Sequence, residues 1–321
     1  MKLLAAPASL KGVLSPLEAA ALLAAGMRRV EGIEVVEAPV ADGGEGTAAV
    51  IHAARGGEWR TAVVTDPRGQ TVAARWLLLD DGTAVVDAAA AIGLPLLRED
   101  ERDPLRVTSR GLGELLLATL AARPTSLLVG VGGTATVDGG VGMRGVLGGW
   151  LHDVPIRVAC DVRNPLLGER GAARVFGPQK GATPYDVEEL EVRLAELEEL
   201  APYRDLPGAG AGGGLGAAFA AMGAELVDGA ELVLDLTGFD DKARGAALVV
   251  TGEGTVDATT FEGKAPGAVL RRCAALGVPC ELFGGIVAEG VTAHALSGRR
   301  ALAGEDLVQL GEELALGFDF A

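Results

Sequence analysis

Five short segments of the sequence set acidic, hydroxyl or lysine side chains among small residues, directly after an apolar run. Carboxylates in such positions suit Mg²⁺, which also takes phosphate oxygens as ligands. Glycine N–H groups, helix N-termini and lysines suit the phosphates themselves. The pattern favours phosphoryl transfer, which depends mainly on positioning and charge stabilisation. For any single acid, a helix cap or a turn explains the residue equally well. The candidates are Ser9 and Lys11 in ASLKG, Asp42 in ADGGEGT, Thr134 and Asp138 in GGTATVDGG, Asp161 and Asn164 in ACDVRNP, and Glu253 and Asp257 in TGEGTVDATT.

Lysine is rare in this chain and lies mostly beside glycine. Of the five lysines, Lys11, Lys180 and Lys264 each adjoin a glycine. Lysine at a glycine turn is a common phosphate ligand, although a chain with 48 glycines also produces such neighbours by chance. These three lysines are therefore candidates for binding an anion.

The sequence lacks the patterns on which several other chemistries depend. No GxxxxGK[ST] motif is present, and GVGGTATVDGG has the glycines of a dinucleotide motif without a ribose-binding acid at the usual spacing. The three cysteines and three histidines show no metal-binding spacing. Zinc chemistry and a Ser-His-Asp triad are therefore not expected. For the glycine-rich loop taken alone, a strained structural turn is the alternative.

A recurring order of elements must position these residues: an apolar strand, a loop of small residues, then a helix. Residues 2–30, 33–57, 127–151 and 247–277 follow this order, and residues 278–287 add another strand. Ser15, Pro16 and Glu18 predict one capped helix start, and Thr183 with Pro184 predicts another. Such alternation is typical of a parallel sheet covered by helices on both faces. Ligands of such sheets bind at the carboxyl ends of the strands, where these loops lie.

The remaining segments predict a second domain, since 321 residues are too many for one ordinary core. Residues 60–90 read as short antiparallel strands joined by DPRG and DDGT turns, and residues 156–162 and 231–236 as further strands. We therefore predict an α/β protein with two α/β domains. Residues 1–60, 105–150 and 245–321 would form a Rossmann-like or flavodoxin-like, doubly wound parallel-sheet domain. Residues 60–105 and 150–245 would form an inserted mixed α/β domain.

The charge balance narrows the class of partner. A net charge of −16 disfavours general nucleic-acid binding, which needs a positive field. The apolar runs are of strand length, shorter than a membrane span requires. The N-terminal residues read as a first strand and not as a signal peptide, which predicts a cytoplasmic protein without a membrane partner.

Across nearly its whole length the sequence resembles the bacterial type I glycerate kinases. The segments that carry the resemblance come in the family's order: APASLKG, PVADGGEGT, DPLRVTSRGLGELL, GVGGTATVDGGVGM, ACDVRNPLLGERGAARVFGPQKGATP, PGAGAGGGLGAA and VTGEGTVDATTFEGKAPG. The resemblance implies ATP-dependent phosphorylation of D-glycerate to 2-phosphoglycerate, and two α/β domains with the active site between them. The implied cofactors are ATP and Mg²⁺, and the implied partners are small molecules, with a homo-oligomer left open.

On this reading we assign roles to the candidate residues. The catalytic residues would be Lys11, Asp138 and Asp161, with Asp138 orienting or deprotonating the substrate hydroxyl. Lys11, Lys180 and Lys264 would neutralise phosphate or carboxylate. The metal ligands would be Asp42 and Asp257, and the residues near glycerate would be Ser9, Asn164 and Lys180. The residues near the nucleotide would be Gly132, Gly133, Thr134, Gly139, Gly140, Glu253 and Lys264.

The sequence departs from the family pattern at three positions. Ala8 stands where the family usually has an acid, Leu10 where it has an aromatic residue, and Val137 where it has Asn. The loss of an acid at position 8 leaves a second hypothesis open, a non-catalytic protein that binds a small hydroxy acid on the same fold. A dinucleotide-dependent dehydrogenase is a third, although no ribose-binding acid can be located.

Overall fold

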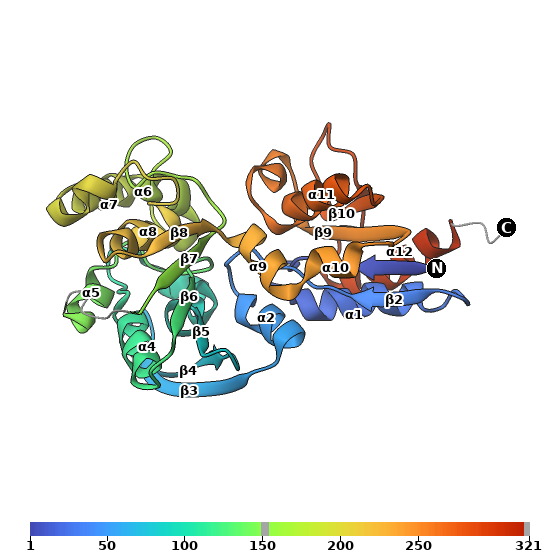
Figure 1. The fold of residues 1–321 in the computed structure, drawn as a ribbon. Coiled ribbons are helices and arrows are strands. Elements are labelled where there is room, and N and C mark those ends of the chain that lie inside the picture. Colours follow the sequence, from blue (N-terminus) through green and yellow to red (C-terminus); the bar gives the residue numbers. More distant parts are fainter. Residues whose placement is uncertain (149–153, 318–321) are drawn as a thin grey trace. The chain divides into compact units, whose positions relative to one another are not determined.

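The computed structural model describes residues 1–148 and 154–317, and the chain divides into two compact units. Unit 1 comprises Met1–Asp42, Ala49–Ala54 and Ala230–Ala321, and unit 2 comprises Gly43–Ala48 and Arg55–Gly229. Figure 1 shows the elements of both units. Each unit has its own sheet and its own apolar core.

The sheet of unit 1 is parallel throughout. Its strand order is β11-β10-β9-β1-β2. Strand β1 therefore pairs on one side with a strand close to it in sequence and on the other with a strand from the last third of the chain. The strands are β1 (Lys2–Ala5), β2 (Glu34–Glu37), β9 (Leu248–Val256), β10 (Cys280–Val287) and β11 (His294–Ala295).

Helices cover both faces of this sheet, as the alternating elements predict. Helices α1 (Pro16–Met27) and α12 (Ala303–Leu316) pack on one face, in a cluster with β1, β9 and β10. The other face is covered by α9 (Gly229–Thr237), α10 (Phe239–Ala243) and α11 (Ala265–Leu276). The short helices η5 (Ala258–Glu262) and η6 (Arg300–Leu302) precede α11 and α12. The helix α2 (Thr47–Arg55) has residues in both units.

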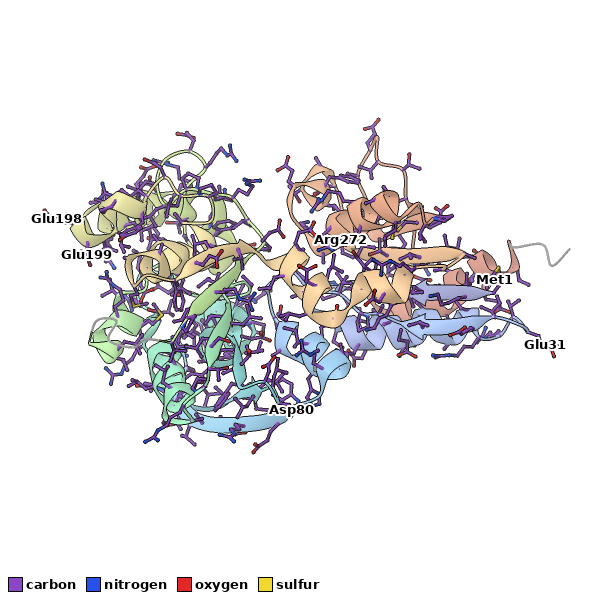
Figure 2. The ribbon with its side chains drawn as sticks, in the orientation of Figure 1. Met1, Glu31, Asp80, Glu198, Glu199 and Arg272 are labelled. Atoms are coloured by element: carbon purple, nitrogen blue, oxygen red, sulfur yellow. The ribbon has the colours of Figure 1, made fainter. Side chains whose placement is uncertain are left out.

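Local interactions fix the ends and contacts of these helices. Ser15 caps α1 in a complete capping box with Glu18, and Pro16 is its first residue, as predicted. A Cβ at Gly26 of α1 would lie 1.9 Å from the Val308 carbonyl oxygen of α12, so glycine allows the two helices to touch. On α11, the guanidinium of Arg272, labelled in Figure 2, donates to Glu231 of α9 and Asp240 of α10.

Unit 2 has a mixed sheet with strand order β3-β4-β5-β6-β7-β8. The first three strands are antiparallel and joined by the predicted DPRG and DDGT turns, and the last three run parallel to β5. The strands are β3 (Glu58–Thr65), β4 (Thr71–Leu78), β5 (Thr83–Asp87), β6 (Ser126–Gly130), β7 (Ile156–Cys160) and β8 (Glu225–Asp228).

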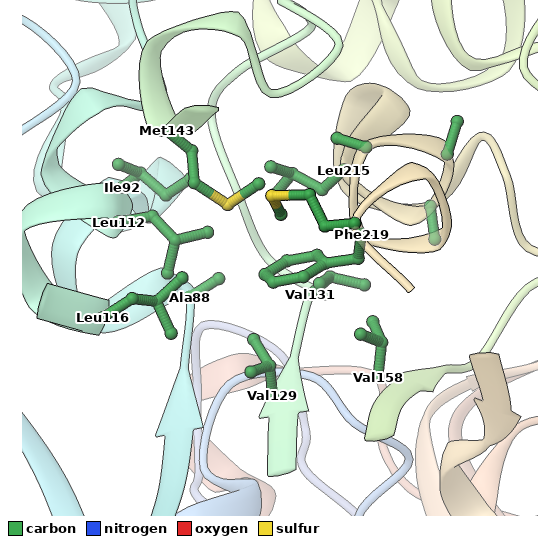
Figure 3. Close-up of a cluster of buried hydrophobic side chains, with 14 of the residues drawn as sticks. Ala88, Ile92, Leu112, Leu116, Val129, Val131, Met143, Val158, Leu215 and Phe219 are labelled. Atoms are coloured by element: carbon green, nitrogen blue, oxygen red, sulfur yellow. The ribbon is translucent and has the colours of Figure 1, made fainter. Parts of the chain in front are cut away.

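A large apolar cluster joins the helices of unit 2 to its sheet. Figure 3 shows Phe219 of the glycine-rich helix α8 beside Val131, with Val129 and Val158 on the strands below. Thr183 caps α7, as predicted, and Asp186 completes a capping box with it. The helices are α3 (Ala89–Ile92), α4 (Arg110–Ala121), α5 (Val141–Leu147), α6 (Ala172–Phe176), α7 (Pro184–Ala195) and α8 (Ala211–Ala221), with short η1 (Leu94–Leu96), η2 (Glu99–Glu101), η3 (Pro178–Lys180) and η4 (Glu198–Tyr203).

The division of the chain differs from the predicted one. We expected residues 105–150 in the same domain as the N-terminal strand, but β6 pairs with β5 and β7, which makes these residues part of unit 2. Both sheets use the same order of strand, loop and helix. The order alone therefore cannot say which sheet a strand joins, because that depends on long-range pairing.

Residues 231–236 were expected to form a strand and instead lie within helix α9. The buried residues in and beside this segment are Ala230, Val233, Leu234 and Thr237. They are spaced three and four residues apart, which is typical of one face of a helix. The predicted helix from residue 141 ends at Leu147 among the described residues, and residues 149–151 lie outside them. None of the described helices has the length and hydrophobicity of a membrane span.

Candidate functional site

The chemistry-bearing loops of unit 1 meet at the carboxyl ends of its parallel strands. A pocket of about 210 Å³ lies there. Ser9, Lys11, Glu253 and Lys264, all predicted site residues, line it. The loop after β1 supplies the first two, the end of β9 supplies Glu253, and Lys264 is the residue that precedes α11. This part of the predicted site is therefore brought together in one place.

Glu253 and Lys264 form the polar centre of this pocket. Glu253 Oε1 accepts a 2.7 Å hydrogen bond from Thr260 Oγ1 and lies 3.4 Å from Lys264 Nζ. The same ammonium lies 4.0 Å from Asp257 Oδ1, which also accepts hydrogen bonds from the backbone and hydroxyl of Thr259. Asp257 is thus both the cap of η5 and a neighbour of the lysine.

The two acids respond oppositely to this environment. Burial raises the pKa of Glu253, the negative charge of nearby Asp42 raises it further, and the bonds from Thr260 and Lys264 work against the rise. The hydroxyl of Thr259, with its backbone N–H, holds the pKa of Asp257 below its usual value. Asp42 and Glu253 lie close enough to repel each other, which is an arrangement that a cation would stabilise.

The departures at positions 8 and 10 fall on buried residues beside this pocket. Ala8 is buried in the apolar cluster under α11, and its N–H donates to the Gly252 carbonyl. Leu10 is buried in the cluster under α1 and also lines the pocket. At both positions the side chain contributes to packing, so the loop keeps its place without the family's usual acid and aromatic residue.

A second polar cluster lies in unit 2 around the buried Lys180. Its ammonium donates to the Thr136 carbonyl oxygen at 2.8 Å and lies 3.3 Å from Thr134 Oγ1. Burial lowers the pKa of Lys180 to about 7, against the opposing effect of Asp138. The Thr136 hydroxyl is buried and has no hydrogen-bond partner. Thr134 and Asp138, predicted from one segment, and Lys180, predicted from another, are therefore neighbours.

Asp138 is engaged with the starts of two helices. One of its oxygens accepts hydrogen bonds from the backbone and hydroxyl of Ser109, just before α4, and from the Gly142 N–H in α5. Its other oxygen accepts from the Gly140 N–H at 3.1 Å. This geometry makes Asp138 a helix-capping group whose oxygens face protein donors. It gives little support to the expected role of proton acceptor.

The glycines between residues 132 and 140 are needed for packing inside unit 2. A Cβ at Gly132 would lie 2.6 Å from Gly44 Cα, and one at Gly139 would lie 2.4 Å from Leu197 Cδ1. The N–H groups of Gly132 and Gly139 donate to backbone carbonyls, and that of Gly140 donates to Asp138. These three N–H groups are therefore already bonded and do not form the expected phosphate cradle. Gly133 has a φ of 74°, in the left-handed region that favours glycine.

Asp161 and Asn164 follow β7 in unit 2. The Asn164 side chain donates to the Arg170 carbonyl at 2.7 Å, and its own carbonyl accepts from the Gly210 N–H. Asn164 thus ties its loop to the glycine-rich segment before α8. Within the described part of the chain, no hydrogen bond joins Asn164 to Lys180, so the expected grouping of these two residues around one substrate gains no support.

Asp87, at the end of β5, was missed by the sequence analysis. Its carboxylate accepts 3.1 Å hydrogen bonds from the N–H groups of Gly46 and Ala48, where α2 begins. Burial raises the pKa of Asp87 to about 7, against those two bonds and with a smaller contribution from Glu45. An acid directly after an apolar strand, in TAVVDAAAA, was the signal that would have found it.

No group of three or more His, Cys, Asp or Glu side chains within residues 1–148 and 154–317 is arranged to hold a metal ion. A metal held here would take one or two carboxylates from the protein and its remaining ligands from phosphate and water, which is the usual manner of Mg²⁺ binding. Asp42 and Asp257, the two expected metal ligands, would supply that number of carboxylates.

Comparison with known proteins links both units to one family. The model of the Glycerate kinase family matches residues 3–154 and 149–304. The chain is 43% identical to Glycerate 2-kinase of Escherichia coli (strain K12) over 272 residues, which cover 73% of this chain and 71% of that protein. It is 40% identical to Glycerate kinase of Bacillus subtilis (strain 168) over 279 residues, covering 75% and 73%.

A solved structure agrees over almost the full length. A crystal structure of a glycerate kinase 2 candidate from Salmonella typhimurium LT2 has a TM-score of 0.80 and 35% sequence identity, and the match covers 99% of this chain and 98% of that one. Family, sequence relatives and fold agree, so this chain belongs to the glycerate kinase family.

Proposed function

We propose that this chain is an ATP-dependent kinase that phosphorylates a hydroxyl group of D-glycerate, giving 2-phosphoglycerate. The observation that carries the proposal is the 43% identity to Glycerate 2-kinase over 272 residues, which include segments of both units. The polar clusters of the two units add support. Phosphoryl transfer moves a charged group between two anions, and lysines held beside carboxylates supply the positive charge that this transfer requires.

The proposed roles follow from the charges at each cluster. In unit 1, Lys11 and Lys264 would neutralise phosphate oxygens, and Glu253 would hold Lys264 in place through their 3.4 Å contact. In unit 2, Lys180 would fix the loop that contains Thr134 and Thr136. Asp138 would keep the starts of α4 and α5 in register with that loop.

Asp42 and Asp257 would hold Mg²⁺, which supplies charge neutralisation at phosphate oxygens when bound. The negative charge of Asp42 adds to the effect of burial in raising the pKa of Glu253, and this supports a cation beside Asp42, because repulsion between two carboxylates is relieved by a divalent cation. Lys264 offers partial compensation at the Glu253 carboxylate.

A coupled assay of ADP release with D-glycerate, ATP and Mg²⁺ tests the activity. We expect turnover that depends on all three components. Phosphorus NMR of the product tests the position of transfer, with 2-phosphoglycerate expected and 3-phosphoglycerate contradicting that part of the proposal. Stabilisation by glycerate without turnover would favour the non-catalytic binding protein instead. A dehydrogenase would require binding of NAD(H), which we expect to be absent.

A further inference from the structure

We propose that the pocket of unit 1 binds the phosphoryl donor as an adenine nucleotide, with the base against an apolar wall and the phosphates toward Lys11, Lys264, Arg299 and Arg300. The proposal rests on the proposed function and deepens it, because it names the unit and the residues that hold the donor. It also moves the nucleotide away from the glycines of residues 132–140.

The first argument is a local reversal of charge. The whole chain has 44 acidic and 28 basic residues, yet four basic side chains, Lys11, Lys264, Arg299 and Arg300, and two acidic ones line this pocket. A cationic pocket in an acidic protein needs an anionic ligand to stabilise it.

The second argument is which of these charges are already paired. Glu253 accepts from Thr260 and contacts Lys264, and Asp306 accepts from the Ser297 hydroxyl at 2.6 Å. Within the described part of the chain, the side chains of Lys11, Arg299 and Arg300 have no ion-pair partner. The acids of the pocket are thus engaged by the protein, while three of its cations remain available to phosphates.

The third argument is the apolar part of the pocket lining, which we call the apolar wall. Leu10, Val13, Leu296 and Ala303 line the pocket, together with the exposed Ile286. Glycerate is too polar to need such a wall, whereas a purine base gains from packing against aliphatic side chains. An anion with an apolar planar end therefore fits this lining better than a small hydroxy acid does.

The size and place of the pocket agree with this assignment. At about 210 Å³ it is smaller than the roughly 300–1,000 Å³ of sites that enclose a drug-sized ligand, so it would hold part of a nucleotide and leave the rest exposed. It lies past the carboxyl ends of β1, β9 and β10, where open parallel sheets bind their ligands. The glycine-rich loop of residues 132–140 is less suited to bind phosphates, because the N–H groups of Gly132, Gly139 and Gly140 already have protein acceptors.

Isothermal titration calorimetry of ADP, without glycerate, tests the proposal. We expect the Arg299→Ala/Arg300→Ala double variant to bind ADP at least tenfold more weakly, because each change removes a charged contact to a phosphate. Arg106→Ala is the matched control, because Arg106 is an exposed arginine that does not line the pocket. Both arginines of the double variant are exposed, so folding should be unaffected.

Filling the pocket gives a second, independent test. Ala303→Leu would place a larger side chain in the apolar wall and is expected to weaken ADP binding, whereas Ala301→Leu adds the same atoms at an exposed position outside the lining. Photolabelling with 8-azido-ATP should modify peptides that contain residues 9–14 or 285–306. If Ala303→Leu unfolds, the arginine variant and the labelling decide.

Three results would overturn the assignment: ADP affinity unchanged in the arginine variant, photolabel concentrated in residues 130–182, or no ADP binding by the unaltered protein. Failure of the proposed function has a different signature. In that case ADP binding would depend on Arg299 and Arg300 as expected, while glycerate would not be phosphorylated. Turnover of glycerate with a KM for ATP insensitive to both arginines would refute the pocket assignment alone.

Discussion

At the scale of single residues, Lys180 is the unusual side chain of unit 2. It is 4% exposed, and its ammonium bonds to a carbonyl oxygen and a hydroxyl. The charge of Asp138 offsets only part of the lowering of its pKa by burial. A lysine can be buried in this setting because its N–H groups have hydrogen-bond acceptors and because it loses its proton readily, which removes the buried charge. It therefore makes the stability of the protein depend on pH.

The sign of that dependence can be measured. The pKa of Lys180 is lowered from 10.5 to about 7 on folding, so between these values the unfolded chain binds more protons than the folded one. The free energy of unfolding therefore gains a contribution that rises with pH over this window. Urea unfolding of the unaltered protein and of Lys180→Met from pH 7 to pH 10 should give a difference that grows in favour of the lysine. Parallel curves would contradict the buried, easily deprotonated amine.

The variant Asp138→Asn measures separately what Asp138 contributes to stability, as a helix cap, and to catalysis. In Asp138→Asn the amide nitrogen would face backbone and hydroxyl donors that now point at a carboxylate oxygen. We expect a loss of about 1–3 kcal/mol in the free energy of unfolding, with kcat for glycerate falling far more than ADP affinity. Urea titration and steady-state kinetics provide the two readings.

Asp80→Asn, at an exposed aspartate, is the control and should leave both quantities near those of the unaltered protein. An unfolding midpoint of Asp138→Asn equal to that of the control would show that the hydrogen bonds to Ser109 and Gly140 contribute nothing.

The site was partly predictable from residue types. Ser9, Lys11, Glu253 and Lys264 were chosen as polar residues after strands, and they do line one pocket. Arg299 and Arg300 were missed because they follow a two-residue strand that leaves no apolar run to read. The role of glycines 132, 139 and 140 could not be read from the sequence, because a glycine that accommodates a neighbouring helix or loop looks the same in sequence as one that accommodates a phosphate.

At the scale of elements, the glycine-rich start of α8 makes a close backbone contact in unit 2. Gly212, Gly213 and Gly214 all have positive φ, so the segment that reads as one helix contains a sharp bend. A Cβ at Gly213 would lie 2.0 Å from the Thr136 carbonyl oxygen, the same atom that Lys180 binds. The bend therefore helps to hold the loop that carries Thr134 and Thr136.

A pair of glycine substitutions measures this contact. Gly213 has a φ of 76° and a blocked Cβ position, while Gly223 has a φ of 84° and open space around it. Each change to alanine costs about 1–2 kcal/mol for the left-handed backbone. Gly213→Ala should cost distinctly more than Gly223→Ala in urea unfolding, since it also collides with backbone. Equal costs would mean that the α8 start moves away from Thr136 without penalty.

Strands and helices were predictable where local rules decide them. The capping boxes at Ser15 and Thr183 and the turns around β4 are set within a few residues, and the structure confirms them. The sequence could not show to which sheet β6 belongs, because a buried parallel strand has the same kind of apolar run in either sheet. Helix α9 was mistaken for a strand because its apolar residues are nearly continuous and its length is short.

At the scale of the whole molecule, the two units have separate cores. Phe219 is fully buried in the cluster of unit 2, and Phe283 is fully buried in a cluster of unit 1. We expect calorimetry to resolve two unfolding transitions, because units with their own cores tend to unfold separately. Phe219→Ala should lower one transition and Phe283→Ala the other, each losing about 3–5 kcal/mol. A single transition lowered by both changes would contradict this expectation.

The position of β1 between β2 and β9 has a consequence for how the chain is made. Its neighbour on one side is β2, which is synthesised soon after it, but the Thr251 hydroxyl of β9 donates to the Ala6 carbonyl across 245 residues. During synthesis all of unit 2 leaves the ribosome before β9 exists. Until β9 and α12 have been synthesised, one edge of β1 is unpaired and the apolar face of α1 is exposed. Nascent chains of this protein should thus depend on cellular chaperones at their N-terminus until translation has almost ended.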